Sequence, residues 1–463
     1  MLFSSTVFLF CFLPFVSLCY WAARHEIKNY ILLLSSLFFY AWGEPKYISI
    51  MLLVIGINYI VGILLETAHH RKKILVGCGI VANLVILFFF KYTNFFVENI
   101  NVAFNFHITP LNIIMPIGIS FFTFQSISYI IDVYRNEVKP QRDITKLALY
   151  VSLFPQLIAG PIVKYHDIEA NIDNRNVNID DVACGIQRFI VGLSKKVLIA
   201  NILGKVADSV YATGPNGIDA GIAWLGAIAY TMQIFFDFSG YSDMAIGLGK
   251  IFGFHFLENF NYPYISTSIT EFWRRWHISL STWFKEYLYI PLGGNRAGTL
   301  KTYRNLFLVF LATGFWHGAS WNFIVWGLWH GLFIILEKRF RFTEAQSFTK
   351  RTILHFYTIL VFVIGWVFFR AEDLSTAIRY IQAMFGAEPD KRLYSLGHYL
   401  SNQVILTLII AIILSCNVSS LWKNKEYSPL VAAGQNIGYV VLLFLAIVFI
   451  ASSTYNPFIY FRF

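Results

Sequence analysis

The sequence predicts an all-α, polytopic integral membrane protein, on the evidence of its composition, its apolar runs and the placement of its basic residues. Of 463 residues, 57% are hydrophobic and only 13% are charged, whereas soluble domains carry roughly 25% charged residues. A membrane-spanning helix needs about 20 mostly apolar residues, and many runs approach that length. Basic residues concentrate between the runs, as they do in cytoplasmic loops.

About eleven hydrophobic segments can be distinguished, several of them too short to cross a membrane alone. They cover residues 2–20, 30–42, 48–65, 74–90, 113–131, 222–236, 306–313, 323–336, 353–369, 405–416 and 440–450. No Lys or Arg precedes the first segment and no clear small-residue cleavage site follows it. We therefore expect a retained helix there rather than a signal peptide.

Basic residues follow the odd-numbered segments among the first five, and this sets the predicted topology. Arg24 and Lys28 follow the first segment, HRKK at 70–73 follows the third, and several Lys and Arg residues at 135–146 follow the fifth. Positive charge favours the cytoplasmic side, so the N-terminus is expected outside. Counting onward from the basic residues at 338–351 places the C-terminus outside as well.

Proline and glycine interrupt the apolar pattern between residues 147 and 316. Broken or re-entrant helices are tolerated at membrane depth only where the backbone is buried in protein or lines a wet cavity, so this section is the expected functional core. We predict a single membrane domain over 1–463. Its parts are N-terminal spans at 1–146, the core at 147–337, and further spans with an aromatic tail at 338–463.

The charge and the placement of the cysteines argue against a nucleic-acid site and a zinc site. The formal charge is +10, but no nucleic-acid-binding motif accompanies it, and basic cytoplasmic loops explain it. We therefore expect the protein to lie in a lipid bilayer and to bind no nucleic acid. The five cysteines are scattered without C-x-x-C spacing. This argues against a zinc site or a disulfide framework, and no metal is expected.

The densest polar cluster, SITEFWRRWHISLS at 268–281 and its continuation to 296, has two interpretations. The first interpretation is an interfacial helix with an aromatic belt and snorkelling arginines. Alternatively it is an anion site, because the planar arginine fork matches phosphate oxygens. In that case the phosphates of a cytoplasmic, nucleotide-bearing donor are held by Arg274, Arg275, Lys285 and Arg296.

Histidines and carboxylates in apolar stretches are further candidates. His317 lies among tryptophans and glycines at membrane depth, where ionisable groups are functional candidates. Burial there favours the neutral imidazole that a general base needs, although a packing role is the alternative. His330 is expected to be structural. Asp237 and Asp243 are expected to pair with arginines of the 268–296 cluster or to cap a broken helix.

Three stretches closely resemble the membrane-bound O-acyltransferase family, in its bacterial branch that O-acetylates alginate and peptidoglycan. They are DFSGYSDMAIGLG at 237–249, ENFNYPYISTSITEFWRRWHISLSTWFKEYLYIPLGGNR at 258–296, and FWHGASWNFIVWGLWHG at 315–331. Further matching stretches lie at 115–135, 154–163 and 363–377. The resemblance covers nearly the whole chain and its motifs are specific.

The resemblance implies a funnel-shaped helical domain with a thin centre in the bacterial inner membrane. His317 falls on the catalytic histidine of the WHG motif, and His277 on the histidine of the WHxSLS motif. The implied donor is cytoplasmic acetyl-CoA, and the implied acceptor is an envelope polysaccharide, either alginate-like or peptidoglycan. A separate periplasmic serine acetyltransferase is the implied partner.

Two other functions remain as alternatives. A polysaccharide or lipid transporter would also need broken helices and intramembrane polar groups, but it would not need a basic histidine. An intramembrane metalloprotease could use His277 and His317 as ligands, although no H-E-x-x-H pattern is present.

The C-terminal segment NPFIYFRF, residues 456–463, is unusually aromatic. Each buried apolar side chain contributes roughly 1.5 to 3 kcal/mol, so we expect this segment to fold back into the outer mouth of the protein. It resembles the tyrosine-containing tail of the small partner protein in the related cell-wall D-alanylation system. We hypothesise that Tyr460 accepts acetyl with His317 as base; the alternative is an interfacial anchor with Arg462 at the headgroups.

Overall fold

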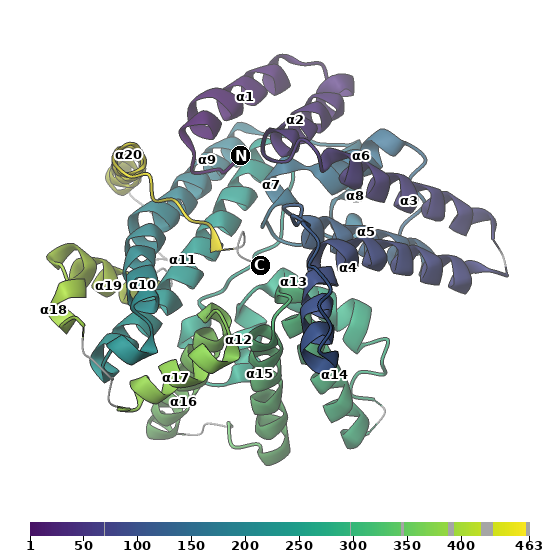
Figure 1. Ribbon diagram of the computed structural model, residues 1–463. Helices are drawn as coiled ribbons and strands as arrows, with labels where there is room; N and C mark the ends of the chain where they lie inside the picture. Colours follow the sequence, from purple (N-terminus) through teal and green to yellow (C-terminus); the bar gives the residue numbers. More distant parts are fainter. Residues whose placement is uncertain (69, 297, 344–346, 388–392, 418–428, 460–463) are drawn as a thin grey trace. The chain divides into compact units, whose positions relative to one another are not determined.

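The computed structural model describes the whole chain apart from residues 69, 297, 344–346, 388–392, 418–428 and 460–463 (Figure 1). Throughout the described residues the regular structure is helical, without strands, which confirms the predicted all-α class. The chain divides into two compact units. The first unit contains Met1–Phe189 and Tyr241–Leu257, and the second contains Ile190–Gly240 and Glu258–Phe463.

Helices α9 and α11 each contribute residues to both units, and the remaining helices belong to one unit. The helices up to α11 are α1 Leu13–Ala22, α2 Lys28–Gly43, α3 Ile48–Thr67, α4 Lys72–Phe104, α5 Ile119–Tyr134, α6 Ile144–Ser152, α7 Phe154–Leu157, α8 Tyr165–Asp173, α9 Ile179–Ser194, α10 Asn201–Thr213 and α11 Ala220–Ile251. A π-helical turn, Lys195–Ala200, joins α9 to α10.

Short helices follow α11, and longer ones return after residue 299. They are α12 Ile269–Arg275, α13 Ile278–Phe284, α14 Thr299–His317, α15 Trp321–Phe340, α16 Phe348–Arg370, α17 Leu374–Met384, α18 Leu396–Tyr399, α19 Asn402–Ser415 and α20 Pro429–Ser452. The seven-residue helices α12 and α13 confirm the broken helices expected in this section.

Five helices of the described chain are long and apolar enough to cross a membrane. Their spanning stretches are Ile48–Thr67, Lys72–Phe104, Ala220–Ile251, Phe348–Arg370 and Ala433–Ser452. Only 6% of the last stretch is buried within the protein. An apolar helix of which so little is covered by the rest of the protein is suited to contact lipid. The chain is a multi-pass membrane protein.

In the first unit, polar pairs and close contacts fix neighbouring helices. Asn58 of α3 and Asn83 of α4 are both fully buried and exchange amide hydrogen bonds of 3.0 Å in each direction. A Cβ on Gly62 of α3 would lie 2.6 Å from the Tyr129 hydroxyl of α5. Helix α5 can therefore approach α3 only because residue 62 has no side chain.

Two helices extend well beyond their predicted apolar segments. The segment predicted at 222–236 continues to residue 251 as α11, and the one predicted at 306–313 spans residues 299–317 as α14. Several of their polar residues have specific partners. The Asn305 amide, for example, donates to the Leu292 and Gly294 carbonyls at 3.1 and 2.9 Å. Hydropathy alone underestimates a helix whose polar groups are paired within the protein.

Candidate active site

His317 is the last residue of α14, which forms a hairpin with α15. Gly314 and Gly327 lie where the two helices touch, and a Cβ on either would overlap a backbone carbonyl, that of Phe323 or Phe310 respectively. The helices therefore approach at backbone contact distance. Glycine at these two positions is therefore what lets the helix that ends in His317 lie against its neighbour.

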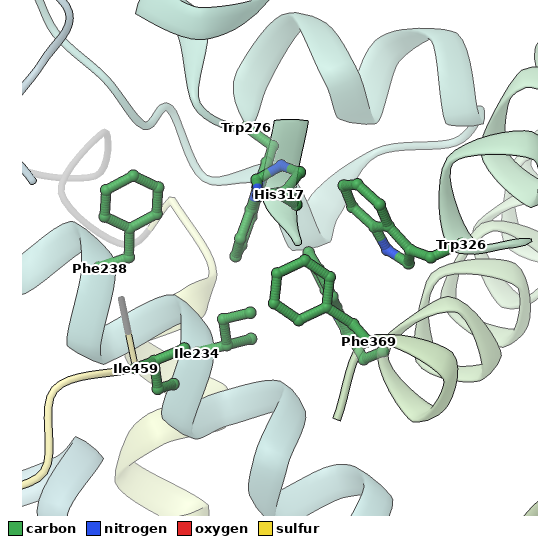
Figure 2. Close-up of a pocket in the computed structure, with 8 residues that line it drawn as sticks. Ile234, Phe238, Trp276, His317, Trp326, Phe369 and Ile459 are labelled. Atoms are coloured by element: carbon green, nitrogen blue, oxygen red, sulfur yellow. The ribbon is translucent and has the colours of Figure 1, made fainter. Parts of the chain in front are cut away.

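His317 is 6% exposed and borders a small aromatic pocket in the second unit. The pocket is lined by Ile234, Phe238, Trp276, His317, Trp326, Trp366, Phe369 and Ile459. Figure 2 shows the rings of Trp276, Trp326 and Phe369 gathered around the imidazole. The Trp326 ring meets it edge-on at a centroid distance of 4.8 Å. The pocket encloses about 10 Å³, close to what one water molecule requires.

His277 is 1% exposed and lies at the junction of α12 and α13 with a left-handed backbone, φ 44°. A positive φ in a residue other than glycine is uncommon and concentrates at functional sites. The Ile278 amide donates to the Asn259 carbonyl at 2.9 Å. This bond ties the junction to the preceding extended stretch.

The Asn259 side chain fixes the tautomer of His277. Its Oδ1 accepts from the Ser279 amide at 3.2 Å and the Ser279 hydroxyl at 2.9 Å, and it lies 3.2 Å from His277 Nδ1. A backbone N–H can only donate, so the Asn259 atom facing it is the oxygen. His277 Nδ1 must then carry the proton, and Nε2 is the basic nitrogen.

One tryptophan connects the two histidines. The Trp316 ring lies 4.7 Å from His317 and 6.4 Å from His277 between centroids. Phe238, which lines the His317 pocket, meets His277 edge-on at 4.6 Å. The two imidazoles therefore belong to one aromatic cluster of the second unit.

The basic side chains predicted to bind phosphate have different surroundings. Arg274, Lys285 and Arg296 are exposed. Arg275 is only partly exposed and pairs with Glu271 at 2.9 Å, while its Nη1 donates to the Asn261 carbonyl at 3.1 Å. Their role in phosphate binding stays a prediction.

Pairing with arginines of the 268–296 cluster was one of two alternatives expected for Asp237 and Asp243, and the structure gives both aspartates other cations. Asp237 pairs with Lys196 at 2.7 Å and Asp243 with Arg188 at 2.6 Å. Both cations precede α11 in sequence and lie in or next to α9. The structural role predicted for the two aspartates fits these ion pairs.

His330 lies away from the pocket lining and is fully buried. Its ring packs against Trp273 at 5.3 Å and Trp326 at 5.4 Å between centroids. This packing agrees with the structural role predicted for it.

Sequence reasoning missed Lys196 and Asn259. Lys196 is 3% exposed within the apolar stretch IVGLSKKVLIA, where an intramembrane ionisable residue would have marked it as a candidate. Asn259 carries no such signal, because asparagine is ordinary in a loop. Only the folded chain brings its oxygen to His277.

The last two described residues of the C-terminal segment are buried. Phe458 and Ile459 are 4% and 5% exposed, and Ile459 lines the pocket of His317. The predicted burial of these two residues is confirmed. Tyr460 and Arg462 lie outside the described residues.

Among the described side chains, one group is close enough to share a metal ion. It contains Asp132, Glu137 and His166 of the first unit and neither His277 nor His317. The His166 ring is bonded to two carboxylates, with Nδ1 2.9 Å from Asp132 and Nε2 3.3 Å from Asp167. An ion-paired histidine accounts for this geometry.

Fold and site together define the class of protein. A multi-pass helical membrane protein presents a buried histidine at the end of a tightly packed hairpin, beside an aromatic pocket. The model of the membrane-bound O-acyltransferase family matches residues 141–374, a range that contains Asn259, His277 and His317. The chain belongs to the membrane-bound O-acyltransferase family and is an O-acyltransferase. This membership favours acyl transfer over the transporter and metalloprotease alternatives.

Individual relatives agree with the family assignment. The Pseudomonas putida protein named probable alginate O-acetylase AlgI is 43% identical over 100% of both chains. The peptidoglycan O-acetyltransferase of Helicobacter pylori is 36% identical over 100% of this chain and 98% of its own. The teichoic acid D-alanyltransferase of Bacillus subtilis is 29% identical over 57% of this chain and 68% of its own.

Proposed function

We propose that this O-acyltransferase takes acetyl from acetyl-CoA and passes it on for O-acetylation of a cell-envelope polysaccharide, with His317 as the general base. The two relatives that match along their whole length are named for O-acetylation of alginate and of peptidoglycan, which supports acetyl and a polysaccharide. One observation carries the proposal most directly. Ile459, the residue before Tyr460, lines the pocket bordered by His317.

In the proposed first step, Tyr460 is the acceptor. The His317 imidazole takes the phenolic proton as the phenol oxygen attacks the thioester carbonyl carbon. A C–O bond forms and the C–S bond breaks, and the leaving CoA thiolate takes the proton back from the imidazolium. The products are CoA and an acetyl-tyrosine ester, and the base is regenerated.

His277 is proposed to assist on the donor side of the same aromatic cluster. Its Nε2, the basic nitrogen set by Asn259, can accept a hydrogen bond from the donor. The exposed Arg274, Lys285 and Arg296 are proposed to contact the CoA phosphates. Arg275 is expected to contribute less, since Glu271 already holds it.

The remaining features complete the proposal. We place the enzyme in the bacterial inner membrane as one domain, with both termini outside and the donor reaching it from the cytoplasm. A periplasmic serine acetyltransferase would receive acetyl from Tyr460 and deliver it to the polymer. The proposal assigns no metal to the reaction.

Tyr460→Phe tests the carrier step, because it keeps the ring and removes the phenolic hydroxyl. Purified enzyme is incubated with isotopically labelled acetyl-CoA and digested, and the C-terminal peptide is analysed for label. Label on Tyr460 of the wild type and none on the variant is the expected result. Wild-type acetyl transfer by Tyr460→Phe would show that the segment serves only as an anchor.

A further inference from the structure

The segment just before Tyr460 is bound by polar side chains of the second unit. Lys196 Nζ donates to the Pro457 carbonyl, and the Ile459 amide donates to Asp237 Oδ2 at 2.9 Å. Closer to α20, the Tyr455 hydroxyl donates to Asp208 Oδ2 at 2.7 Å. We call Lys196, Asp208 and Asp237 the tail clamp.

The centre of the tail clamp is a buried ion pair. Lys196 Nζ lies 2.7 Å from Asp237 Oδ1, and their side chains are 4% and 2% exposed. Removing two charges from water costs several kcal/mol per ion, and their attraction offsets this only when further hydrogen bonds satisfy both groups. The C-terminal segment supplies one such bond to each partner, so the ion pair and the segment complete each other.

The tail clamp binds two backbone groups and one side-chain hydroxyl, and the hydroxyl contact specifies the register. It binds the carbonyl of residue 457 and the amide of residue 459, which lie two positions apart. Pro457 has no N–H that would need a partner. A one-residue slip would offer Lys196 and Asp237 backbone groups of the same kinds, but it would draw the Tyr455 hydroxyl away from Asp208 and would move residue 460 by about 3.3 Å, the rise of an extended residue.

A second contact holds the segment upstream. Asp208 bonds the Tyr455 hydroxyl through Oδ2 and pairs with Arg370 through Oδ1, each at 2.7 Å. The Arg370 guanidinium lies over the Tyr211 ring at 4.9 Å. Asp208 is thus fixed by α16 while it binds the segment, and the segment is held at both ends of residues 455–459.

We propose that Lys196 and Asp237 are positioning residues that hold the C-terminal segment in one register and so present residue 460 to His317. This rests on the proposed function for its effect on catalysis, but the binding of the segment can be measured separately. Removing the clamp should slow acetyl transfer without weakening acetyl-CoA binding, because the residues proposed to contact the CoA phosphates are Arg274, Lys285 and Arg296 and not the clamp residues. A misplacement of about 1 Å can cost roughly 100-fold in rate.

The test uses the full-length double variant Lys196→Met/Asp237→Asn, which leaves no single buried charge. Hydrogen–deuterium exchange of the peptide at 453–463 should accelerate about tenfold or more. The kcat should fall about tenfold or more, with the KM for acetyl-CoA changed less than about twofold. The matched control is Arg188→Met/Asp243→Asn, which removes the ion pair between α9 and α11. It should leave exchange of the C-terminal peptide unchanged.

Tyr455→Phe provides a milder variant if the double variant does not fold, since it removes one hydroxyl and keeps the ring. Its control is Tyr399→Phe, because the Tyr399 hydroxyl bonds Thr213 of α10 at 2.9 Å without touching the segment. Faster exchange only in Tyr455→Phe supports the clamp. Unchanged exchange in both the double variant and Tyr455→Phe would overturn it. If the clamp variants speed exchange while Tyr460→Phe keeps full activity, the clamp only anchors the segment and the carrier step is wrong.

Discussion

At the scale of single residues, the orientation of His277 depends on one side-chain oxygen. Asn259 Oδ1 meets the Ser279 amide, the Ser279 hydroxyl and His277 Nδ1, all within 3.2 Å. Each of these groups donates, so an atom that could also donate would disrupt the arrangement. The protonation of the imidazole is thereby decided by a residue that lies 18 positions away in the sequence.

Asn259→Ala should reduce kcat by about tenfold, because His277 Nδ1 loses its acceptor and both tautomers become available. The KM for acetyl-CoA should change less. Asn83→Ala is a matched control, since it also removes a buried asparagine whose side chain makes three hydrogen bonds but lies in the first unit. If the two variants lose activity only in proportion to lost folded protein, Asn259 has a merely structural role.

His317→Gln should leave the protein folded in the membrane and lower acetyl transfer by about 10²- to 10⁴-fold, the usual contribution of a general base. Glutamine keeps a polar side chain of similar size but cannot take up a proton. His255→Gln, at an exposed position, should retain wild-type rate. A His317→Gln enzyme with more than about a tenth of the wild-type rate would contradict the assignment of the base.

At the scale of elements, the hairpin of α14 and α15 determines where His317 lies. The helices meet at glycines 314 and 327, and Phe310 and Phe323 contribute the opposing carbonyls. Asn322 then fastens the start of α15 by donating to the Ala371 carbonyl at 2.6 Å. Since His317 is the last residue of α14, any separation of the helices moves the imidazole.

Gly327→Ala should destabilise the protein by about 1–3 kcal/mol, as overpacking usually does, and should lower activity further by displacing His317. Thermal unfolding in detergent and acetyl transfer measure the two effects. Gly56→Ala is the control, because a Cβ there meets nothing within 4 Å. Equal behaviour of the two variants would show that α14 and α15 can separate without consequence.

Helix α8 contributes a pH-dependent ion pair outside the five candidate membrane spans. The hydrogen bond to Asp132, followed by that to Asp167, raises the pKa of His166 from 6.5 to about 10. His166 therefore holds its proton more tightly in the folded protein than in the unfolded chain. The stabilisation is complete below pH 6.5 and is lost as the pH rises toward about 10.

Thermal midpoints between about pH 6 and pH 10 test this ion pair. The midpoint of the wild type should fall more steeply across this range than that of His166→Gln, which has no titrating group at the position. Parallel curves for the two proteins would mean that the ion pair contributes nothing measurable, as many partly exposed pairs do.

At the scale of the whole molecule, the charge distribution predicts which loops face the cytoplasm. The basic residues 70–73, where α4 begins, are expected inside, and the nearly neutral stretch after α4 is expected outside. Helix α4 spans Lys72–Phe104, which is long enough to cross the bilayer between them.

Single cysteines placed in a background without the five native ones test this topology. A membrane-impermeant maleimide should label Asn105→Cys in intact cells, whereas Lys72→Cys should react only after the membrane is opened. The opposite pattern would invert the predicted orientation. Both positions lie at the ends of α4, so accessibility rather than burial decides the result.

Much of the architecture was predictable because membrane solvation acts on local sequence. Apolar runs gave the all-α class and most helix positions, and motifs around His277 and His317 gave the family. The segments predicted for α11 and α14 were too short, since hydropathy does not register polar residues that find partners inside the protein.

The sequence by itself determined the membrane class and the family and made His277 and His317 candidates, because each inference depends on residues close together in the chain. Only the tertiary structure decided the partners of buried polar groups. Asp237 binds the Ile459 amide across 222 positions and Lys196 binds the Pro457 carbonyl across 261. Such pairs leave no periodic signal in the sequence, and a buried charge can be matched to its partner only when the chain between them has folded.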